Sequence, residues 1–444
     1  MNKQPINRNY ILVILLIHVV YFLFALYFKQ IYTLDSGEYI LTARNLLDHG
    51  VVYNGIWGED LLPELHTLRP PLYGSFIFLS RLFSSSDFLV LFFQNIISIV
   101  LWVLFISWFN RSFTRKNIEP YVVMALIFFP SQMIEVNSIM ADLLLEFLLL
   151  ISFLFLVRYH QSDKSLHIVL LNLFLALALF TKPIMLYFWI PNLIYSVYLY
   201  AKSKNYVIIL SFLLLPFVAF IWSLRNMSKT EVFMYSSAKS QNLLDFNAGS
   251  VLKFLHGDKE SKEIVIGILN SPKTKNGYAE KTEFLLDTAS QIISDNKLIY
   301  FYCHVKGMFN FMLSTCRMEL IEFFPGRPNE VSSLVEETEK RGFKGFLSYL
   351  DSINPLYLLF LGCILVFNIL LLLSSLTLIF NREIDISIRI FVSILILYIC
   401  FMASPAGYSR FKVCVIPFML INMPFVFAYF KTHFRRLLPF LTQS

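Results

Sequence analysis

Two carboxylates stand three residues apart in segment 34–39, Leu-Asp-Ser-Gly-Glu-Tyr, directly after the first long apolar run of the chain. Within a helical turn, Asp35 and Glu38 could face the same way. Partial burial beside a membrane removes water from a carboxylate, which raises its pKa and its value as a base. The pair is therefore a candidate acid–base site. The alternative is structural, because Asp35 could cap a short helix running through residues 43–47.

The chain that must position these groups is strongly apolar. Of its 444 residues, 57% are hydrophobic and 15% are charged, and the mean hydropathy is +0.63. A soluble domain usually carries about a quarter charged residues, so too little polar surface is present to cover a water-exposed globule. The net charge of +7 would suggest nucleic acid in a soluble protein. Here the basic residues fall mainly in short loops between apolar runs, where they orient a membrane protein.

Apolar runs suited to membrane helices recur along the sequence. Each span needs roughly 20 apolar residues, so there is room for about ten. The first run lacks a small-residue cleavage site and is interpreted as an uncleaved span. Runs 72–83 and 298–313 suit helices at the outer interface. We therefore predict an all-α polytopic protein whose spans cover residues 10–28, 88–109, 121–134, 139–157, 166–180, 184–200, 206–224, 356–380, 386–403 and 413–430.

Basic residues indicate how these spans are oriented. With the N terminus inside, every predicted inner segment is basic, as short cytoplasmic loops usually are. This predicts both termini in the cytoplasm and one integral membrane domain, 1–444, with two large segments on the outer side, 29–87 and 226–355, which are named the first and second outer loops after this prediction. The second contains a helix-like stretch, 279–293. The inner basic residues are Arg111, Arg115, Lys116, Arg158, Lys164, Lys202, Lys204, Arg382, Arg389, Lys431, Arg435 and Arg436.

Short motifs follow one another in an order that resembles the GT-C glycosyltransferases. Segment Asp35-Ser-Gly-Glu-Tyr39 is similar to the first external loop of bacterial members related to protein O-mannosyltransferases and aminoarabinose transferases. These often carry Asp-Glu there, whereas Ser36 stands second here. Later motifs that resemble the family's are Arg69-Pro-Pro-Leu-Tyr73, Ser138-Ile-Met-Ala-Asp142, Thr181-Lys182-Pro183, Trp222-Ser-Leu-Arg225-Asn226 and Tyr408-Ser-Arg410-Phe411. The resemblance covers most of the chain and rests on the set of motifs.

The resemblance implies transfer of a monosaccharide from a polyprenyl-phosphate carrier to a lipid, glycan or protein acceptor. The reaction would take place on the outer face of the bacterial cytoplasmic membrane, as an inverting displacement. Asp35 would be the general base, with Glu38 as a second catalytic carboxylate. A phosphate leaving group gains negative charge as the glycosidic bond breaks, so fixed cations lower the barrier. The implied donor-phosphate ligands are Arg69, Lys182, Arg225 and Arg410, and the implied cavity residues are Tyr39, Tyr73, Asp142 and Tyr408.

Each of these charged residues also has a structural interpretation. Arg69 could reach lipid phosphates from the interface, and Asp142 could be a helix N-terminal charge favoured by the helix dipole. Lys182, Arg225 and Arg410 could serve orientation or lipid contact. Lys182 is the more informative of these, because a lysine on the outer side runs against the basic-inside trend.

Neither a metal nor another cofactor is assigned from the sequence. Some relatives in the GT-C family bind divalent cations, and Glu64 or His66 near Arg69 could contribute ligands, but no paired His/carboxylate motif stands at ligand spacing. The five cysteines are scattered and indicate neither a disulfide framework nor a zinc site. Walker, GxGxxG, GxSxG and HExxH motifs are absent from the sequence.

The expected partners are a polyprenyl-phosphate-linked sugar, its acceptor and membrane lipids, with no nucleic acid. An alternative is a transporter or flippase of lipid-linked saccharides, which predicts charged residues at mid-span depth. The predicted spans are almost free of them, with His18 and Glu146 as exceptions. A polysaccharide polymerase is a third interpretation, which keeps the outer location but joins glycan chains.

Overall fold

The computed structural model describes residues 6–58, 60–113, 116–324, 341–345, 348 and 354–431. This part of the chain is helical and contains no strand, which confirms the all-α class. The helices are α1 (Arg8–Phe28), α2 (Ser36–His49), η1 (Pro63–His66), α3 (Pro71–Arg81), α4 (Asp87–Ser112), α5 (Glu119–Phe128), α6 (Ser131–Val136), α7 (Asp142–Ser162), α8 (Ser165–Thr181), η2 (Pro183–Phe188), α9 (Trp189–Ser203), α10 (Val207–Phe212), α11 (Leu214–Thr230), α12 (Ala238–Asn242), η3 (Leu243–Ala248), α13 (Gly249–Leu269), η4 (Pro272–Lys275), α14 (Tyr278–Asp295), α15 (Lys297–Leu313), α16 (Arg317–Phe323), α18 (Pro355–Leu378), α19 (Ile386–Met402), η5 (Ser409–Val415) and α20 (Ile416–Leu420).

Six helical stretches of the described chain are long and apolar enough to cross a membrane. They are α1, α4, α7, η2 with α9, α10 with α11, and α18. The bent pair Ser409–Leu420 and Met423–Lys431, which turns by 59°, would make a seventh if it is one span. Three further predicted spans correspond to shorter apolar helices, α5, α8 and α19. The protein is therefore compatible with a membrane, and the count of ten spans stays a prediction.

The predicted span 121–134 is split in the structure. Helix α5 ends at Phe128, and Phe129 takes a non-helical conformation before α6 begins at Ser131. Pro130 explains the break, because the residue before a proline is sterically kept out of the helical region. The predicted stretch 279–293 and the two interfacial runs are helical, in α14, α3 and α15. Segments 325–340, 346–347 and 349–353 of the second outer loop, and Arg115, Arg435 and Arg436, lie outside the described residues.

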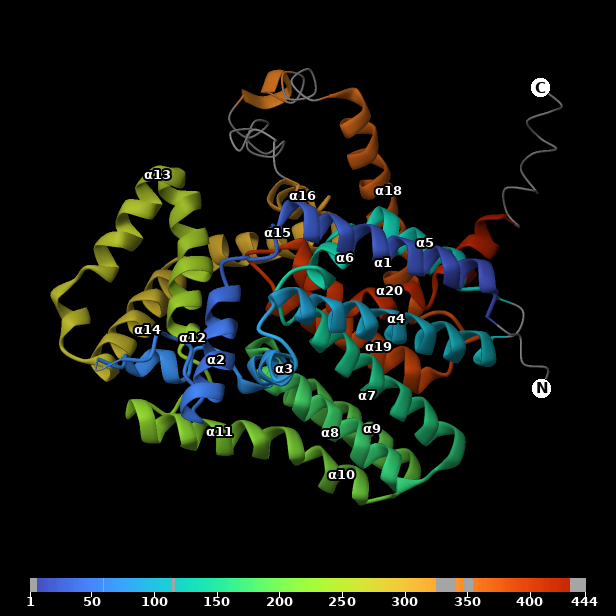
Figure 1. Cartoon of the computed structure of the whole chain (residues 1–444), viewed down its shortest axis with the longest axis horizontal. Coiled ribbons are helices and arrows are strands. Elements are labelled where there is room, and N and C mark those ends of the chain that lie inside the picture. Colours follow the sequence, from blue (N-terminus) through green and yellow to red (C-terminus); the bar gives the residue numbers. More distant parts are fainter. Residues whose placement is uncertain are drawn as a thin grey trace.

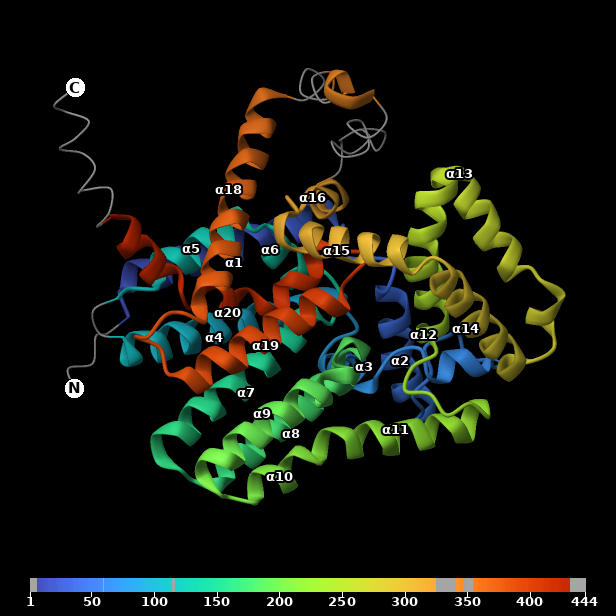
Figure 2. The same ribbon diagram turned by 180° about the vertical axis from the view of Figure 1, so that it is seen from behind.

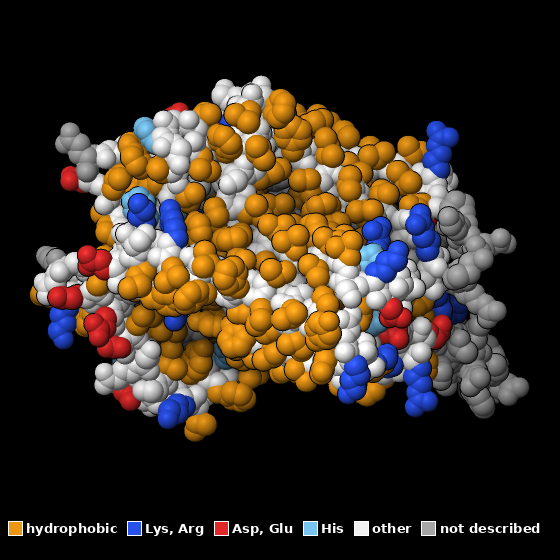
Figure 3. All heavy atoms as spheres, turned by 90° about the horizontal axis from the view of Figure 1, so that it is seen from below, with side chains coloured by type: hydrophobic (Ala, Val, Ile, Leu, Met, Phe, Trp, Pro, Cys, Tyr) orange, Lys and Arg blue, Asp and Glu red, His pale blue; other side chains and the backbone are white. Residues whose placement is uncertain are grey.

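Helices α1, α4, α7 and α8 run broadly along the long axis of the molecule, and α2 with α12, α13 and α14 gathers at one end (Figure 1). The start of α1 and the last described helix lie at the other end. Figure 3 shows apolar side chains across the middle of one face, with charged side chains toward both ends. Large apolar side chains also stay exposed on the helices themselves, such as Leu16 of α1 and Phe217 of α11. This distribution is typical of a surface that faces lipid.

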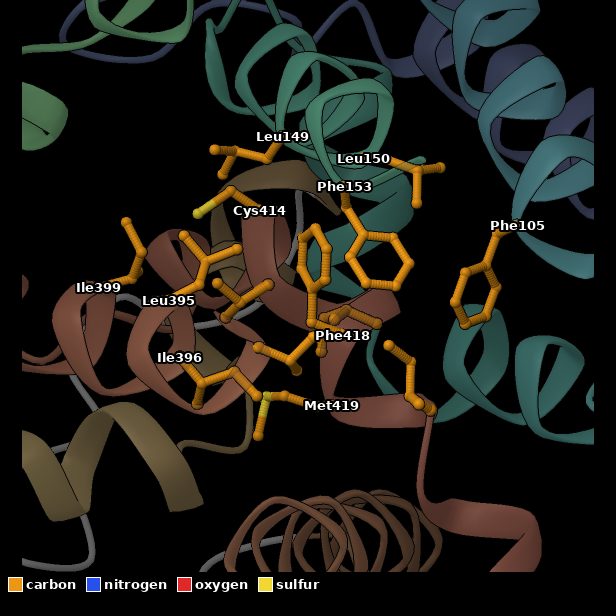
Figure 4. Close-up of a cluster of buried hydrophobic side chains, with 14 of the residues drawn as sticks. Phe105, Leu149, Leu150, Phe153, Leu395, Ile396, Ile399, Cys414, Phe418 and Met419 are labelled. Carbon is orange, nitrogen blue, oxygen red and sulfur yellow. The ribbon is translucent and has the colours of Figure 1, made fainter. Parts of the chain in front are cut away.

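A buried apolar core joins helices from both halves of the sequence (Figure 4). The ring of Phe153 on α7 meets Phe418 on α20 edge to face, with centroids 5.6 Å apart. Phe105 of α4 and Leu395 of α19 are fully buried around them. Close packing of this kind holds helices together where lipid supplies no hydrophobic driving force. The core therefore fixes η5, which continues directly into α20, against α7.

Helix α15 of the second outer loop lies against α19 and η5 (Figure 2). At Gly307 its backbone touches the chain that leads into η5, and a Cβ there would overlap the backbone of Pro405. Only a residue without a side chain fits this contact. The outer loop is thus seated on the segment that precedes Arg410.

We expect Gly307→Ala to lower the unfolding free energy of the purified protein by about 1–3 kcal/mol, because overpacking displaces backbone rather than a flexible side chain. The measurement is the thermal unfolding midpoint in detergent. Gly267→Ala on α13 is the matched control, since a Cβ there meets open space and alanine favours a helix. Equal midpoints for the two variants would show that the contact is unimportant.

Candidate functional site

Asp35 stands immediately before α2, in the position of a helix cap, but its side chain makes no capping hydrogen bond. Ser36 organises the turn instead. Its hydroxyl oxygen accepts the N–H of Thr33 at 2.8 Å, and the hydroxyl donates to the carbonyl of Ile139 at 2.9 Å. The capping interpretation of Asp35 is therefore wrong, and its carboxylate is available for other partners.

Arg69 binds both carboxylates of the first outer loop. Its Nη2 donates to Asp35 Oδ1 at 2.8 Å, and its Nε donates to Glu38 Oε2. The guanidinium also lies 5.6 Å from the centre of the Tyr39 ring. The Arg69 backbone N–H donates to Asn54 Oδ1 at 3.0 Å, and Pro70 then leads into α3, which begins at Pro71. Asp35 and Glu38 thus face the same way, as expected, and the folded loop holds their common partner.

Arg410 reaches the same carboxylate from the far end of the sequence. Its Nη2 lies 3.2 Å from Asp35 Oδ2, so each oxygen of Asp35 faces one arginine. The backbone N–H of Arg410 donates to Glu319 Oε1 at 3.1 Å, and the Ser409 hydroxyl donates to the same oxygen. Glu319, on α16, therefore ties the second outer loop to the arginine at Asp35.

Lys182 and Asp142 form a second ion pair beside this one. The Lys182 ammonium lies 2.7 Å from both oxygens of Asp142. The lysine side chain is 7% exposed and the aspartate 1%. The ring of Phe411 lies 5.0 Å from the Lys182 ammonium and 5.1 Å from the Arg410 guanidinium. Asp142 is also the first residue of α7. It is therefore both a helix N-terminal charge and an acidic member of the charged cluster.

The cations decide the charge state of Asp35. Burial would raise the pKa of Asp35, but Arg69, Arg410 and Lys182 together outweigh burial and hold it below its ordinary value. The expectation of a raised pKa at Asp35 is therefore wrong. It holds for Glu38, whose pKa burial raises, with Arg69 reversing only part of the rise. The reason is proximity, because three positive charges favour the ionised form of Asp35.

The predicted aromatic residues occupy different environments. Tyr39 and Tyr73 are fully buried, with ring centres 4.9 Å apart in an edge-to-face contact. The Tyr73 hydroxyl donates to Gln94, whose amide holds the carbonyls of residues 136 and 138. Tyr408 is 45% exposed, and its ring lies 6.2 Å from that of Phe246 in η3. Tyr39 and Tyr73 thus support the charged cluster from within, and Tyr408 lies at its surface.

Arg225 does not join the other predicted cations in the contacts described. It donates to the carbonyls of His66 at 2.6 Å and Val52 at 3.1 Å. Its guanidinium stacks on Trp222 of its own helix, 4.8 Å from the ring centre. Both carbonyls belong to the first outer loop. Arg225 therefore tethers that loop to α11, a role that its position in a short motif could not reveal.

We expect Arg225→Ala to lower the unfolding free energy by roughly 1.5–3 kcal/mol, the contribution of hydrogen bonds from a charged group. Residues 50–68 should also become more accessible to proteases. Thermal midpoints and the mapped cleavage rate measure both effects. The control is Lys229→Ala, an exposed cation one turn further along α11. If both variants behave alike, the tether does not stabilise the loop.

Glu64 and His66 do not form a metal site in the structure. Lys281 donates to Glu64 Oε1 at 3.1 Å, and the ring of His66 packs on Tyr53 at 4.7 Å. Across the described residues, no group of three or more His, Cys, Asp or Glu side chains is placed to hold a metal ion. Both side chains thus have partners within the protein.

Three further acidic residues lie near the cluster and were not singled out in the sequence. Glu135, Glu319 and Glu322 line one small pocket together with Thr33, two residues before Asp35. The available signal was Glu135, a lone charge in an apolar run, which marks a functional position in a membrane protein. Glu319 and Glu322 carry no such signal, because they belong to a polar outer loop.

The structure thus brings Asp35, Glu38, Arg69, Arg410 and the Lys182–Asp142 pair into one cluster at the end of the apolar bundle. The segments that supply them are up to several hundred residues apart in the sequence. Compared with protein-family models, with curated proteins and with solved structures, the chain matches none.

Proposed function

We propose that this protein is a membrane glycosyltransferase of the GT-C type, which transfers a monosaccharide from polyprenyl phosphate to an acceptor. The observation that carries this proposal is a single carboxylate, Asp35, set between Arg69 and Arg410 with the Lys182–Asp142 pair alongside. In this proposal the chain crosses the bacterial cytoplasmic membrane ten times and both termini are cytoplasmic. The charged cluster then faces the outer side, where lipid-linked sugars meet their acceptors.

Donor binding would use the two arginines at Asp35. A guanidinium group matches the geometry of phosphate oxygens and stays charged at all relevant pH values. Arg69 and Arg410 are bound to carboxylates in the structure. The phosphate of the donor would compete with Asp35 for both of them. The exchange keeps each arginine paired with an anion throughout, and the charge that loses its partners is that of Asp35.

This competition would activate the base. As Arg69 and Arg410 turn toward the phosphate, Asp35 loses the cations that hold its pKa down, and its basicity rises. Asp35 then takes the proton of the acceptor, and the acceptor atom bonds to C1 of the sugar. The bond from C1 to the phosphate oxygen breaks and its electron pair stays on polyprenyl phosphate. The arginines stabilise that developing charge, and the sugar configuration inverts.

The polar groups within the membrane-type helices support the transferase over a transporter. The ring of His18 on α1 contacts the carbonyl of Ile14 at 2.8 Å and the hydroxyl of Ser98 on α4 at 2.9 Å. Glu146 on α7 accepts a hydrogen bond from Gln132 at 2.7 Å. Both ring nitrogens of His18 and Oε2 of Glu146 thus have partners within the protein, whereas Oε1 of Glu146 is buried without one. Such contacts join helices, whereas a transport path needs ionisable groups that face water.

The direct test incubates the purified protein with a fluorescent polyprenyl-phosphate monosaccharide and an envelope extract, and follows release of polyprenyl phosphate. Mass spectrometry of envelope glycolipids and glycoproteins, from cells with and without the gene, should show a difference of one sugar. Movement of the lipid-linked sugar across liposomes without sugar transfer would instead identify a flippase. Ladders of increasing product length would identify a polymerase.

We expect the acid limb of kcat to lie at higher pH than the acid limb of kcat/KM. The latter reports the free enzyme, where Asp35 has a pKa below its ordinary 3.8 and stays ionised above about pH 4. The former reports the donor complex, where the arginines have left Asp35 and its pKa is higher. Across rates measured from pH 3.5 to pH 8, the acid limb of kcat should lie within the range while kcat/KM stays flat down to about pH 4, and Glu38→Gln should keep this difference. Coincident limbs would contradict base activation by the donor.

A further inference from the structure

A small pocket lies beside the charged cluster and carries an excess of acidic groups. Its lining includes Glu135 of α6, Glu319 and Glu322 of α16, and Tyr32 and Thr33 from the chain that leads into the candidate base. No lysine or arginine is present in the described lining. A ligand that complements this lining therefore has positive charge and hydrogen-bond donors.

Glu135, which lines the pocket, has a carboxylate oxygen that no hydrogen-bond donor of the described residues contacts. Its side chain is only 3% exposed, and its Oε2 atom is buried without a hydrogen-bond partner. Buried carboxylate oxygens are nearly always hydrogen-bonded, and an orphaned one costs free energy. The side chain that lines the pocket therefore carries acceptor capacity that the protein itself leaves unused.

The other two carboxylates keep acceptor capacity for the same group. Glu319 uses Oε1 for both of its hydrogen bonds, from the Ser409 hydroxyl and the Arg410 N–H. Its Oε2 takes no part in these bonds. Glu322 is exposed at the rim of the pocket. Acceptors at different depths thus surround the space in which a ligand would lie.

A primary ammonium fits this arrangement better than a metal ion. Its three N–H donors can bond to acceptors that are spread around a pocket. The rings of Tyr32 and Phe323, which also line it, can contact a cation through their faces. A metal ion needs converging ligands, and the described residues hold no group of carboxylates that meets this need.

We propose that this pocket binds the protonated amine of the acceptor and so brings the acceptor's reacting group to Asp35. The role of the amine in transfer rests on the proposed function, but binding of the amine can be measured without it. A positive acceptor also offsets the charge of a phosphate donor, which enters a region already rich in carboxylates. That region holds Asp35, Glu38, Glu135, Asp142, Glu319 and Glu322 against Arg69, Lys182, Arg410 and Lys412.

The test measures stabilisation of the full chain in detergent by ethylammonium chloride, because a ligand that binds the folded state raises the unfolding temperature. For a probe of three heavy atoms, a dissociation constant of about 1 mM is the best attainable. We expect a saturable rise in the thermal midpoint. In Glu135→Gln and in Glu322→Gln, half-saturation should need at least about 10-fold more probe, a loss of about 1.4 kcal/mol.

Glu263→Gln is the matched control, because Glu263 is an exposed acid of α13 in the same outer loop. It should keep the response of the unaltered chain. Glu322 lies at the rim, so its variant keeps the test valid if the buried Glu135→Gln fails to fold. Tetramethylammonium, which has no N–H donor, should stabilise the protein far less than ethylammonium.

The proposal is overturned if the pocket variants and the control respond alike, or if tetramethylammonium acts as strongly as ethylammonium. It is also overturned if Mg²⁺ or Mn²⁺ gives the variant-dependent stabilisation and ethylammonium does not. Release of polyprenyl phosphate is measured on the same protein. If the protein transfers sugar but does not bind the amine, only the amine-binding proposal is rejected. If it binds the amine but does not transfer sugar, the amine-binding proposal is supported and the proposed glycosyltransferase function is rejected.

Discussion

Replacing Asp35 with asparagine is expected to lower the rate of sugar transfer by about 100-fold to 10,000-fold, the contribution of a positioned general base. Asparagine keeps the size of the side chain and its acceptor oxygen but cannot take the acceptor proton. It also removes the negative charge that Arg69 and Arg410 share in the structure. Donor affinity should therefore stay the same or increase, because both arginines are freed for the phosphate. Initial rates at saturating donor, with a separate donor-binding assay, measure the two effects.

Asp87→Asn is the matched control for this variant. Asp87 pairs with Arg81 at 2.8 Å, the same length as the pair between Asp35 and Arg69. Its side chain is 15% exposed, against 16% for Asp35. Asp87→Asn loses one ion pair and Asp35→Asn loses two. Both thermal midpoints should therefore fall, while only Asp35→Asn loses transfer. Full activity in Asp35→Asn would remove Asp35 from the mechanism.

Breaking the Lys182–Asp142 pair is expected to have the largest effect on stability. Lys182→Met leaves the Asp142 carboxylate, 1% exposed, without its partner. Removing one member of a buried ion pair costs about 3–5 kcal/mol, because the remaining charge stays desolvated. The thermal midpoint in detergent and the yield of monodisperse protein measure this loss. Lys202→Met, which removes an exposed lysine at the end of α9, should change neither.

A double variant separates folding from function at this pair. Lys182→Met with Asp142→Leu removes both charges, and such replacements often restore stability. We expect the thermal midpoint to recover while transfer stays low, because the cluster has lost a cation near the leaving group. Recovery of both properties would show that the pair is purely structural. A midpoint unchanged in the single variant would contradict the stabilising role itself.

Local signals predicted the helices well. Apolar runs, basic loops and proline positions are local properties, and α1, α4, α7 and α14 lie where these signals place them. The pairing of Arg69 with Asp35 and Glu38 was also within reach, since all three belong to one loop. The break at Pro130 divided a run that hydrophobicity alone joins, because backbone sterics at a proline override apolar character.

The sequence did not predict which residues that are distant in the chain would contact one another. Arg225 was expected to bind donor phosphate, yet it donates to two carbonyls of the first outer loop. Every residue has a backbone carbonyl, so residue types do not indicate which carbonyls an arginine will bind. The pKa of Asp35 was expected to rise with burial, and it falls because cations from three segments surround it. Desolvation of a carboxylate can be inferred from its position in the sequence. The combined effect of several charges on its pKa depends on where the tertiary structure places each charged group.

The sequence by itself determined the helical secondary structure, the apolar character that is compatible with a membrane, and the residues able to do chemistry. Of its residues, 57% are hydrophobic and 15% are charged, and helices satisfy their own backbone hydrogen bonds, as a lipid environment requires. Tertiary structure decided which charges meet. It placed Arg410 on Asp35, Lys182 on Asp142 and Glu319 under Arg410, and it left Glu135 without a partner in the adjoining pocket. Electrostatic and hydrogen-bond energies depend on distances of a few ångströms, and folding alone sets such distances between residues that are far apart in the chain.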